Sequence, residues 1–389
     1  MVISLFRSIA AGCALILLAL PAAAFDTSAK AAFVLDQSTG TVLLEKNADI
    51  PLPPASMSKL MTLYVAFEAI RDGRLKLDER LPVSNHAMSY KGSTMFLDTT
   101  DRVTVEDLLR GIIVLSGNDA CAVIAEALSP DGTEAGFAAY ITERGKEMGM
   151  TQSVFKNSNG WPAKGHVMSM RDLAILANRL ILDFPEYYPM FAETEFKFDG
   201  RAPQNTRNRN PLLRLDIGAD GLKTGHTQEA GYGLVGSAQQ GDRRVVFVLS
   251  GIDSTARRAE EAEAIVLWSF RNFAEKTVVK AGQAITEAEV WDGRERSVTL
   301  VPKADLRVLV PTLRTKSVSA EAVHMGPIRA PVKQGQVLGE LVVTPDGLAE
   351  VRLPLVADRD IARGGFMDRV GAAAGYLLEQ FANGAGEPS

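Results

Sequence analysis

The sequence predicts an α+β domain with an antiparallel sheet at residues 25–279, followed by a small all-β sandwich at 280–360. Two apolar strand patterns come first, several helical patterns follow, and further strands with one closing helix return before residue 280. Beyond that point the chain has short apolar runs separated by Gly, Pro and Asp, without a helical period. The length of 389 residues and the hydrophobic content of 46% are sufficient for one large core and one smaller core.

The first domain is expected to begin with a β-hairpin, because two apolar strands flank the turn Gln37-Ser38-Thr39-Gly40. Thr104 and Asp107 form a capping-box pattern at the start of a helix, and Gly241-Asp242 is a turn between two strands. Strands are expected at 32–36, 41–45, 221–223, 231–238 and 244–250. Helices are expected at 56–70, 104–114, 119–128, 169–182 and 257–273.

The second domain contains no catalytic pattern, so we expect it to act as a spacer or docking unit. Its clearest strands are predicted at 306–310 and 337–343. Segment 361–389 has apolar residues at helical spacing, namely Phe366, Val370, Leu377 and Phe381. We expect an amphipathic helix that attaches the protein to the outer surface of the inner membrane. The alternative is a disordered tail, because the segment has few basic residues and is rich in Gly and Ala.

Residues 1–24 are expected to be a secretory signal peptide. Arg7 precedes an apolar stretch at 9–20, and small residues at 22–24 provide a cleavage site. The apolar stretch is shorter than the ~20 residues that a membrane-spanning helix needs. We therefore expect a periplasmic protein. Cys121 would then be its single cysteine, so the fold must be stabilised by its own core rather than by an intramolecular disulfide.

The composition argues against nucleic-acid and metal binding. The net charge is −5 with both signs interspersed, and no strongly basic stretch is present. The four histidines are far apart in the sequence and, with one remaining cysteine, form no metal-ligand spacing. We expect no metal, no cofactor and no nucleic-acid partner.

Three short motifs occur in one order and together indicate acyl transfer. They are Ser56-Met57-Ser58-Lys59, Ser116-Gly117-Asn118 and Lys223-Thr224-Gly225. They supply a serine nucleophile, two lysines that can manage its proton, a second hydroxyl and an amide. This is the equipment for a covalent serine ester. Each motif alone is a weak signal, but the three together in this order are a strong one.

A second Ser-x-x-Lys pair shows that spacing alone does not identify the nucleophile. Ser153 and Lys156 have the same separation, but they lie in a predicted loop. Ser56 and Lys59 instead open a long apolar helix, where residues three apart share one face. The helix N-terminus also favours the negative charge of an oxyanion.

The chemistry of acyl transfer assigns a role to residues of the first two motifs. Ser56 Oγ would attack a carbonyl, and Lys59 is the candidate base. A free lysine has a pKa of about 10.4, and lowering it to near 7 requires roughly 4 kcal/mol of disfavoured charge. We expect burial and the nearby cation Lys223 to provide it. Ser116 is placed to pass a proton to the leaving amine, and Asn118 can hydrogen-bond the bound peptide.

The third motif is suited to a substrate carboxylate. Lys223 supplies a cation, Thr224 a hydroxyl, and Gly225 allows the backbone to approach the ligand closely. The backbone N–H of His226, with that of Ser56, would form an oxyanion hole.

Arg258 begins the last helix of the domain and is a second candidate for the carboxylate. The alternative is a surface arginine that pairs with Glu261 one helical turn later.

The mature chain resembles the low-molecular-mass penicillin-binding proteins that are D-alanyl-D-alanine carboxypeptidases. The resemblance lies in residues 55–62, 116–121 and 220–227, and in Asn208-Arg209-Asn210 ahead of two leucines. It implies a β-lactamase/transpeptidase-like catalytic domain, a β-rich C-terminal domain and an amphipathic C-terminal anchor. It also implies removal of the last D-alanine from peptidoglycan stem pentapeptides and covalent inhibition by β-lactams. The weakly basic C-terminal helix departs from the family pattern and puts tight membrane binding in doubt.

Site residues carried over by the resemblance match those derived from the motifs. Ser56 is implied as the nucleophile and Lys59 as its base, while Ser116, Asn118 and Lys223 complete the centre. Residues implied or expected to bind substrate are Thr224, Gly225, His226, Arg258 and Arg209.

Three alternatives remain at this point. A β-lactamase of this fold needs a deacylating glutamate, but no Glu-x-x-Leu-Asn pattern lies between Asn118 and Lys223. Glu186, Glu193 and Glu195 lie in this interval in unsuitable surroundings. We therefore expect slow deacylation. A DD-endopeptidase is a nearer alternative, though such relatives usually lack the second domain. A non-catalytic wall-binding module is the third.

Overall fold

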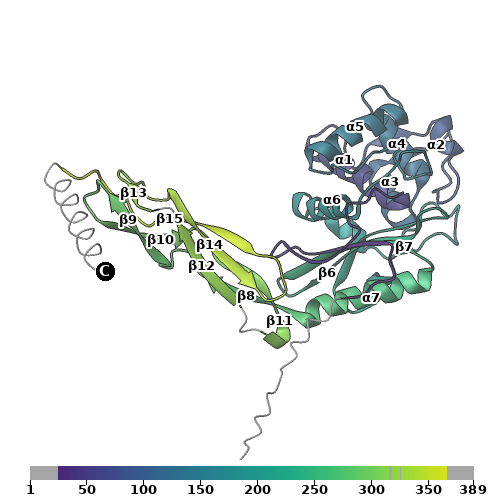
Figure 1. The fold of residues 1–389 in the computed structure, drawn as a ribbon. Helices are drawn as coiled ribbons and strands as arrows, with labels where there is room; N and C mark the ends of the chain where they lie inside the picture. Colours follow the sequence, from purple (N-terminus) through teal and green to yellow (C-terminus); the bar gives the residue numbers. More distant parts are fainter. Residues whose placement is uncertain (1–24, 315–317, 325, 366–389) are drawn as a thin grey trace, which may run out of the picture.

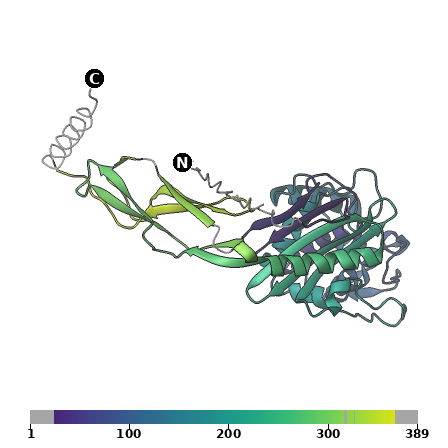
Figure 2. The same cartoon turned by 60° about the horizontal axis from the view of Figure 1, so that its bottom comes forward.

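The computed structural model describes residues 25–314, 318–324 and 326–365. The expected signal peptide at 1–24 and most of the expected C-terminal helix, 366–389, lie outside the described residues. Figures 1 and 2 show an α+β domain from which the C-terminal strands extend away. No helix in the described part of the chain is both long and apolar enough to span a membrane.

A five-stranded antiparallel sheet forms the centre of the first domain, as the strand pattern predicts. Its strand order is β2-β1-β7-β6-β5. The strands are β1 (Ala31–Asp36), β2 (Thr41–Lys46), β5 (Ala219–Thr227), β6 (Gly231–Gln240) and β7 (Arg243–Ile252). Both expected hairpins are present, and β1 pairs with β7 from Ala31↔Ser250 to Asp36↔Val245. The third sequence motif therefore lies on β5, an edge strand of the sheet, with its residues buried.

The helices pack in two layers on the sheet (Figure 1). On the helical side are α1 (Lys59–Arg71), α2 (Asn85–Ser89), α3 (Val105–Arg110), α4 (Asn118–Leu128), α5 (Glu134–Glu147) and α6 (Met170–Asp183). A single long helix, α7 (Thr255–Asn272), covers the other face (Figure 2). Shorter elements on the helical side are β3 (Arg80–Pro82), β4 (Arg102–Thr104) and η3 (Tyr188–Ala192), whereas η4 (Pro211–Arg214) packs through Leu212 into the core that contains α7.

Strand β7 shows how the sequence separates the two layers. Val246 and Val248 belong to the core shared with the helical side, whereas Phe247 and Leu249 pack in the core that contains α7. This is the period of two that a strand buried on both faces requires. Helix α1 lies deep in the helical layer, with every residue from Lys59 to Ala69 buried. The residues that precede this helix are consequently held against a rigid core.

The helix expected at 104–114 differs from a regular α-helix. Thr104 caps α3 as predicted, since its side chain accepts a hydrogen bond from the Asp107 N–H. After Arg110 the backbone widens into a π-helix, η2 (Gly111–Leu115). It ends at Ser116, whose φ of 62° is left-handed. Single π turns of this kind often occur at functional sites, and this one ends at the second sequence motif.

The C-terminal domain is all-β, as expected. One sheet has the strand order β12-β14-β15-β10-β9-β13, and a second sheet pairs β11 with β8. The strands are β8 (Phe273–Val279), β9 (Thr286–Trp291), β10 (Ser297–Pro302), β11 (Leu306–Pro311), β12 (Val318–His324), β13 (Ile328–Arg329), β14 (Val337–Pro345) and β15 (Val351–Ala357). A short 3₁₀ turn, η5 (Thr312–Arg314), follows β11. Both sheets contribute to one hydrophobic core.

The boundary between the domains stays a prediction, but strand pairing bears on it. Strand β8 follows α7 without a loop and pairs with β11, so by pairing 273–279 belongs with the C-terminal strands. At the other end, the described part of segment 361–389 is extended. Ile361 bridges Val332, and Arg363 bridges Gly293.

A buried ion pair connects the sheet to the junction between the domains. Arg243 Nε lies 2.5 Å from Asp36 Oδ2, and the Asp36 carboxylate is fully buried. The same guanidinium donates to the carbonyls of Ser269 and Phe273, at 2.8 and 2.6 Å. It therefore joins β1 and β7 to the end of α7 and the start of β8.

We predict that Arg243→Met lowers the free energy of unfolding of the catalytic domain by about 3–5 kcal/mol, because it leaves the Asp36 carboxylate buried without a cation. The control is Lys146→Ala, which removes an exposed pair with Glu143 and should cost at most about 1 kcal/mol. Urea unfolding followed by circular dichroism measures both. Equal losses in the two variants would contradict the structural role of Arg243.

Candidate active site

The nucleophile turn, residues 53–58, connects the first hairpin to α1. Its last part is a 3₁₀ turn, η1 (Ala55–Ser58), so Ser56 lies one turn before the α-helix rather than inside it. Ala55 has a φ of 48°, which is uncommon for a residue with a Cβ. Its neighbours Ala55, Met57 and Ser58 are buried, while Ser56 is only half-buried. The turn therefore presents the Ser56 side chain toward the surface from a rigid support.

Lys59 joins three segments of the chain. Its Nζ lies 2.9 Å from Ser56 Oγ, 2.7 Å from Asn118 Oδ1 and 2.6 Å from the carbonyl oxygen of Asn159. The side chain is fully buried. Burial is the main cause that lowers the pKa of Lys59 to about 8, and the charge of Arg209 lowers it further. The structure thus provides the depressed pKa that a lysine base needs.

The cation that lowers the pKa of Lys59 is not the one expected from the sequence. Arg209, rather than Lys223, is the cation that lowers the pKa of Lys59. The repulsion between the two lysines acts on Lys223 instead, whose pKa lies well below the usual lysine value because of burial and then the charge of Lys59. Lys223 is buried, and its Nζ donates to the Thr224 carbonyl at 3.1 Å.

The second motif lies at the junction of η2 and α4, as the sequence suggests. Asn118 is the first residue of α4, and its amide is held at both ends. Its Oδ1 accepts from Lys59, and its Nδ2 donates to the Lys91 carbonyl at 2.8 Å. Ser116 is buried, and its Oγ has no hydrogen-bond partner among the described residues. A buried hydroxyl without a partner is available to a ligand.

Asn159 is the residue of the centre that sequence reasoning missed. Its buried backbone carbonyl accepts from Lys59, and its Oδ1 accepts from the Trp161 N–H at 2.9 Å. Glu134 fixes the same loop by accepting from the Ser158 N–H at 2.9 Å. The polar run from Asn157 to Gly160 was the available signal, but nothing in it indicated contact with Lys59.

The second Ser-x-x-Lys pair does not form a site. Ser153 is buried, and its Oγ donates to Asp172 Oδ2 at 2.7 Å, which is a structural bond between the loop and α6. The prediction that Ser56 and not Ser153 has the lysine beside it is confirmed by the Ser56–Lys59 contact.

The third motif packs against the nucleophile turn. A Cβ built on Gly225 would lie 2.9 Å from the Pro54 carbonyl oxygen and 3.0 Å from Met57 Cγ, so a larger residue would push β5 away from Ser56. The exposed ring of His226 stacks on Tyr232, with 3.9 Å between ring centroids. Thr224, between Lys223 and Gly225, is buried. An oxyanion hole formed by the N–H groups of His226 and Ser56 stays a prediction.

Arg258 is not paired with Glu261, so the alternative of a surface ion pair is wrong. Glu261 pairs with Arg257 instead and accepts hydrogen bonds from Thr27 and Ser28. Arg258 is only 7% exposed, and its guanidinium lies 5.8 Å above the Tyr232 ring. Its Nε has no hydrogen-bond partner within the described ranges, and burial lowers its pKa.

Arg209 lies at the edge of the centre. Its Nη1 donates to Ser93 Oγ at 2.6 Å, and its Nη2 donates to the Leu115 carbonyl at 3.1 Å, next to Ser116. Its charge contributes to the lowered pKa values of Lys59, Lys223 and Arg258, so the four basic groups act on one another. Such a cluster favours an anionic ligand such as a carboxylate.

Comparison with known proteins gives the family of each domain. The family model described as D-alanyl-D-alanine carboxypeptidase matches residues 19–254. The model described as penicillin-binding protein 5, C-terminal domain, matches residues 273–363. The D-alanyl-D-alanine carboxypeptidase DacC of Escherichia coli is 36% identical, with 94% of each chain covered. DacF of Bacillus subtilis is 32% identical, with 87% of each chain covered.

Solved structures resemble the whole two-domain arrangement. Penicillin-binding protein 5 from Haemophilus influenzae has a TM-score of 0.77 at 31% identity, covering 87% of this chain and 98% of its own. The D-alanyl-D-alanine carboxypeptidase DacD from Francisella tularensis has a TM-score of 0.75 at 28% identity, covering 88% and 96%.

We predict that Gly160→Ala destabilises the protein by about 1–3 kcal/mol more than Gly149→Ala. Both glycines have a positive φ, 80° and 90°, so an alanine is strained by about 1–2 kcal/mol at either position. A Cβ on Gly160 would lie 1.9 Å from the Ala55 carbonyl oxygen, whereas Gly149 has open space. Thermal and urea unfolding measure the difference. Equal losses would show that the loop does not seat on the nucleophile turn.

Proposed function

The chain belongs to the D-alanyl-D-alanine carboxypeptidase family of serine peptidases, and we propose that its reaction proceeds through an acyl-enzyme on Ser56. The protein is a cell-wall hydrolase that removes the terminal D-alanine of the peptidoglycan stem and is inhibited by β-lactams. The observation that supports our assignment is the 2.9 Å contact between Ser56 Oγ and the buried Lys59 Nζ, whose pKa is lowered to about 8.

Lys59 is the general base in the first step. A neutral Lys59 removes the proton from Ser56 Oγ while this oxygen attacks the carbonyl carbon of the penultimate D-alanine. The carbonyl oxygen then carries negative charge, which the backbone N–H groups of Ser56 and His226 stabilise. Asn118 and the Asn159 carbonyl keep the amine of Lys59 directed at the hydroxyl.

Ser116 transfers a proton to the leaving group. When the peptide bond breaks, the nitrogen of the terminal D-alanine must gain a proton to depart as an amine. The Ser116 hydroxyl, which has no partner in the described structure, donates it and is reprotonated from the protonated Lys59. The acyl group then remains on Ser56, and water releases it with regeneration of the hydroxyl.

The cation cluster holds the terminal carboxylate of the substrate. Lys223 and Thr224 lie within β5, Arg258 lies over Tyr232 of the neighbouring strand β6, and Arg209 contacts the Leu115 carbonyl next to Ser116. Arg258 Nε supports this role because it is buried and free of other hydrogen bonds within the described residues. Gly225 lets β5 lie close to the nucleophile turn, so that Ser56 and the basic residues can contact the same ligand.

Slow release of a β-lactam follows from the groups around Ser56. No carboxylate in the described part of the chain hydrogen-bonds Ser56 or Lys59, and the sequence between Asn118 and Lys223 lacks a Glu-x-x-Leu-Asn pattern, which supports slow deacylation. The β-lactamase alternative is not favoured for this reason. The endopeptidase and wall-binding alternatives are not favoured either, since the two-domain relatives are carboxypeptidases.

We place the enzyme in the periplasm, next to the inner membrane. The signal-peptide pattern at 1–24 and the amphipathic pattern at 361–389 support this location. The β-rich domain would then hold the catalytic domain away from the membrane. Removal of 366–389 should transfer the protein from the membrane fraction to the soluble periplasmic fraction, with its activity on soluble peptide retained.

We predict that Ser56→Ala reduces D-alanine release from a diacyl-Lys-D-Ala-D-Ala peptide at least about a thousandfold, because it removes the hydroxyl that contacts Lys59 and forms the ester. The matched control is Ser153→Ala, in the second Ser-x-x-Lys pair. It loses the bond to Asp172 and some stability, but the folded enzyme should keep its activity and its labelling by penicillin. Unchanged release by Ser56→Ala would overturn the mechanism.

We predict that acylation by labelled penicillin becomes faster between pH 7 and pH 9. Lys59 acts as a base only when neutral, and with a pKa of about 8 its neutral fraction rises about tenfold over this range. Arg209→Gln should move the midpoint to higher pH, because it removes a cation that lowers the pKa of Lys59. A rate that is constant from pH 7 to pH 9 would exclude Lys59 as the titrating base.

A further inference from the structure

Glu134 is a buried carboxylate close to the catalytic centre. It is the first residue of α5, where the helix N-terminus favours a negative charge, and it is only 7% exposed. Its Oε1 accepts from the Ser158 N–H at 2.9 Å and from Ser158 Oγ. Its Oε2 accepts from the Tyr90 hydroxyl at 2.6 Å and lies 2.7 Å from His86 Nε2. One carboxylate therefore joins α5 to two separate segments of the chain.

The first of these segments carries an acceptor of Lys59. Ser158 precedes Asn159, whose carbonyl accepts from Lys59 Nζ at 2.6 Å. The Ser158 carbonyl accepts from Thr62 Oγ1 at 2.6 Å, which ties the segment to α1 one turn after Lys59. Ser158 is thus held at its N–H, its hydroxyl and its carbonyl, and Glu134 accepts from the first two. Glu134 therefore fixes the residue that precedes the Asn159 carbonyl.

The second segment leads to the same ammonium group by another path. Tyr90 precedes Lys91, whose carbonyl accepts from Asn118 Nδ2 at 2.8 Å. Asn118 Oδ1 in turn accepts from Lys59 Nζ at 2.7 Å. Within the described residues, Glu134 therefore supports both acceptors of Lys59 other than the nucleophile.

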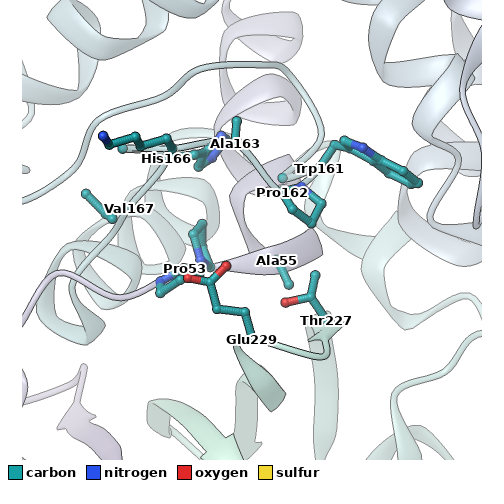
Figure 3. Close-up of a pocket in the computed structure, with 13 residues that line it drawn as sticks. Pro53, Ala55, Trp161, Pro162, Ala163, His166, Val167, Thr227 and Glu229 are labelled. Atoms are coloured by element: carbon teal, nitrogen blue, oxygen red, sulfur yellow. The ribbon is translucent and has the colours of Figure 1, made fainter.

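The two segments also pack against each other. The Tyr90 ring lies edge-on to the Trp161 ring, with 6.2 Å between the ring centroids. A Cβ on Gly92 would lie 3.2 Å from the Trp161 ring. Figure 3 shows Trp161 and Pro162 on one side of a cavity of about 440 Å³, near Ala55 of the nucleophile turn. Loss of the Glu134 carboxylate therefore affects both segments together, next to the nucleophile turn.

Glu134 also supplies a negative charge to the basic centre. Burial raises the pKa of Glu134, but hydrogen bonds, first of all from Ser158, outweigh it, so the pKa lies below the usual glutamate value. The ionised carboxylate raises the pKa of Lys59, against the effects of burial and of Arg209. The charged and titratable groups that interact with Lys59 are Arg209, Lys223, Asp119, Cys121, His166 and Glu134.

We propose that Glu134 is a positioning residue for the acyl-transfer reaction. Its carboxylate holds Asn118 and the Asn159 carbonyl where they direct the amine of Lys59 at the nucleophile. Glu134 makes no hydrogen bond to Ser56 or Lys59 in the described structure and acts through these two acceptors. This inference rests on the proposed function, since it concerns the base of that reaction.

The test compares the pH dependence of acylation by labelled penicillin in Glu134→Gln and Tyr90→Phe. We expect Glu134→Gln to lower the rate at high pH, where Lys59 is neutral, about tenfold or more, because a displaced catalytic group loses this much. Its midpoint should move to lower pH by about half a unit to one unit, because a charge that raises the pKa of Lys59 is removed. Tyr90→Phe removes one hydrogen bond and keeps the charge. It should lower the high-pH rate to a smaller extent and leave the midpoint unchanged.

Glu68→Gln is the matched control, because it removes another buried carboxylate, which pairs with Arg144 of α5. It should lower the free energy of unfolding, measured with urea, and leave both the midpoint and the high-pH rate unchanged.

The outcomes separate this inference from the proposed function. An unchanged high-pH rate or an unmoved midpoint in folded Glu134→Gln would overturn the positioning role, as would an equal loss of rate in Glu68→Gln. If Glu134→Gln does not fold, a full high-pH rate in Tyr90→Phe would overturn it. Penicillin labelling that persists in Ser56→Ala would instead overturn the proposed function.

Discussion

The burial of one ammonium group organises this enzyme. Lys59 is fully buried, so its Nζ needs hydrogen-bond acceptors, and it finds them in Ser56, Asn118 and the Asn159 carbonyl. These acceptors come from three separate segments, and each must be in place for the group to be satisfied. The same burial lowers the pKa of Lys59 to about 8. The burial of this ammonium group therefore has two results. It requires hydrogen bonds from three segments, and it gives Lys59 the low pKa that the reaction needs.

A different structural feature holds each of the three segments in place. The nucleophile turn is held by a buried helix behind it and by Gly225 of β5 in front. A π turn directs Ser116 and Asn118, because the wider turn ends in a left-handed residue before α4 begins. Gly160 lets the Asn159 loop lie directly on the Ala55 carbonyl. At Gly225 and Gly160 the close backbone approach is possible only because the residue has no Cβ.

The catalytic centre and the neighbouring cavity differ in charge. Around Ser56 the basic groups act on one another, and the resulting positive potential fits the terminal carboxylate. Beyond Ala55 the cavity carries Glu229 and Lys164 and an uncharged His166. A peptide with a terminal carboxylate is therefore oriented by the basic groups around Ser56.

Much of the fold and of the centre could be predicted from the sequence, because the features involved are local. The hairpins follow from apolar strands on either side of turn residues, and Ser56 meets Lys59 because residues three apart share one face of a helical turn. Tertiary structure alone decided the rest. Asn159 reaches Lys59 across 100 residues, Arg209 acts on Lys59 through space, and Arg258 is buried away from Glu261. Spacing along the chain determines which residues of one helix or hairpin can touch. The pKa of Lys59 depends instead on burial and on contacts with segments far away in the sequence, and their separation along the chain does not indicate that they meet.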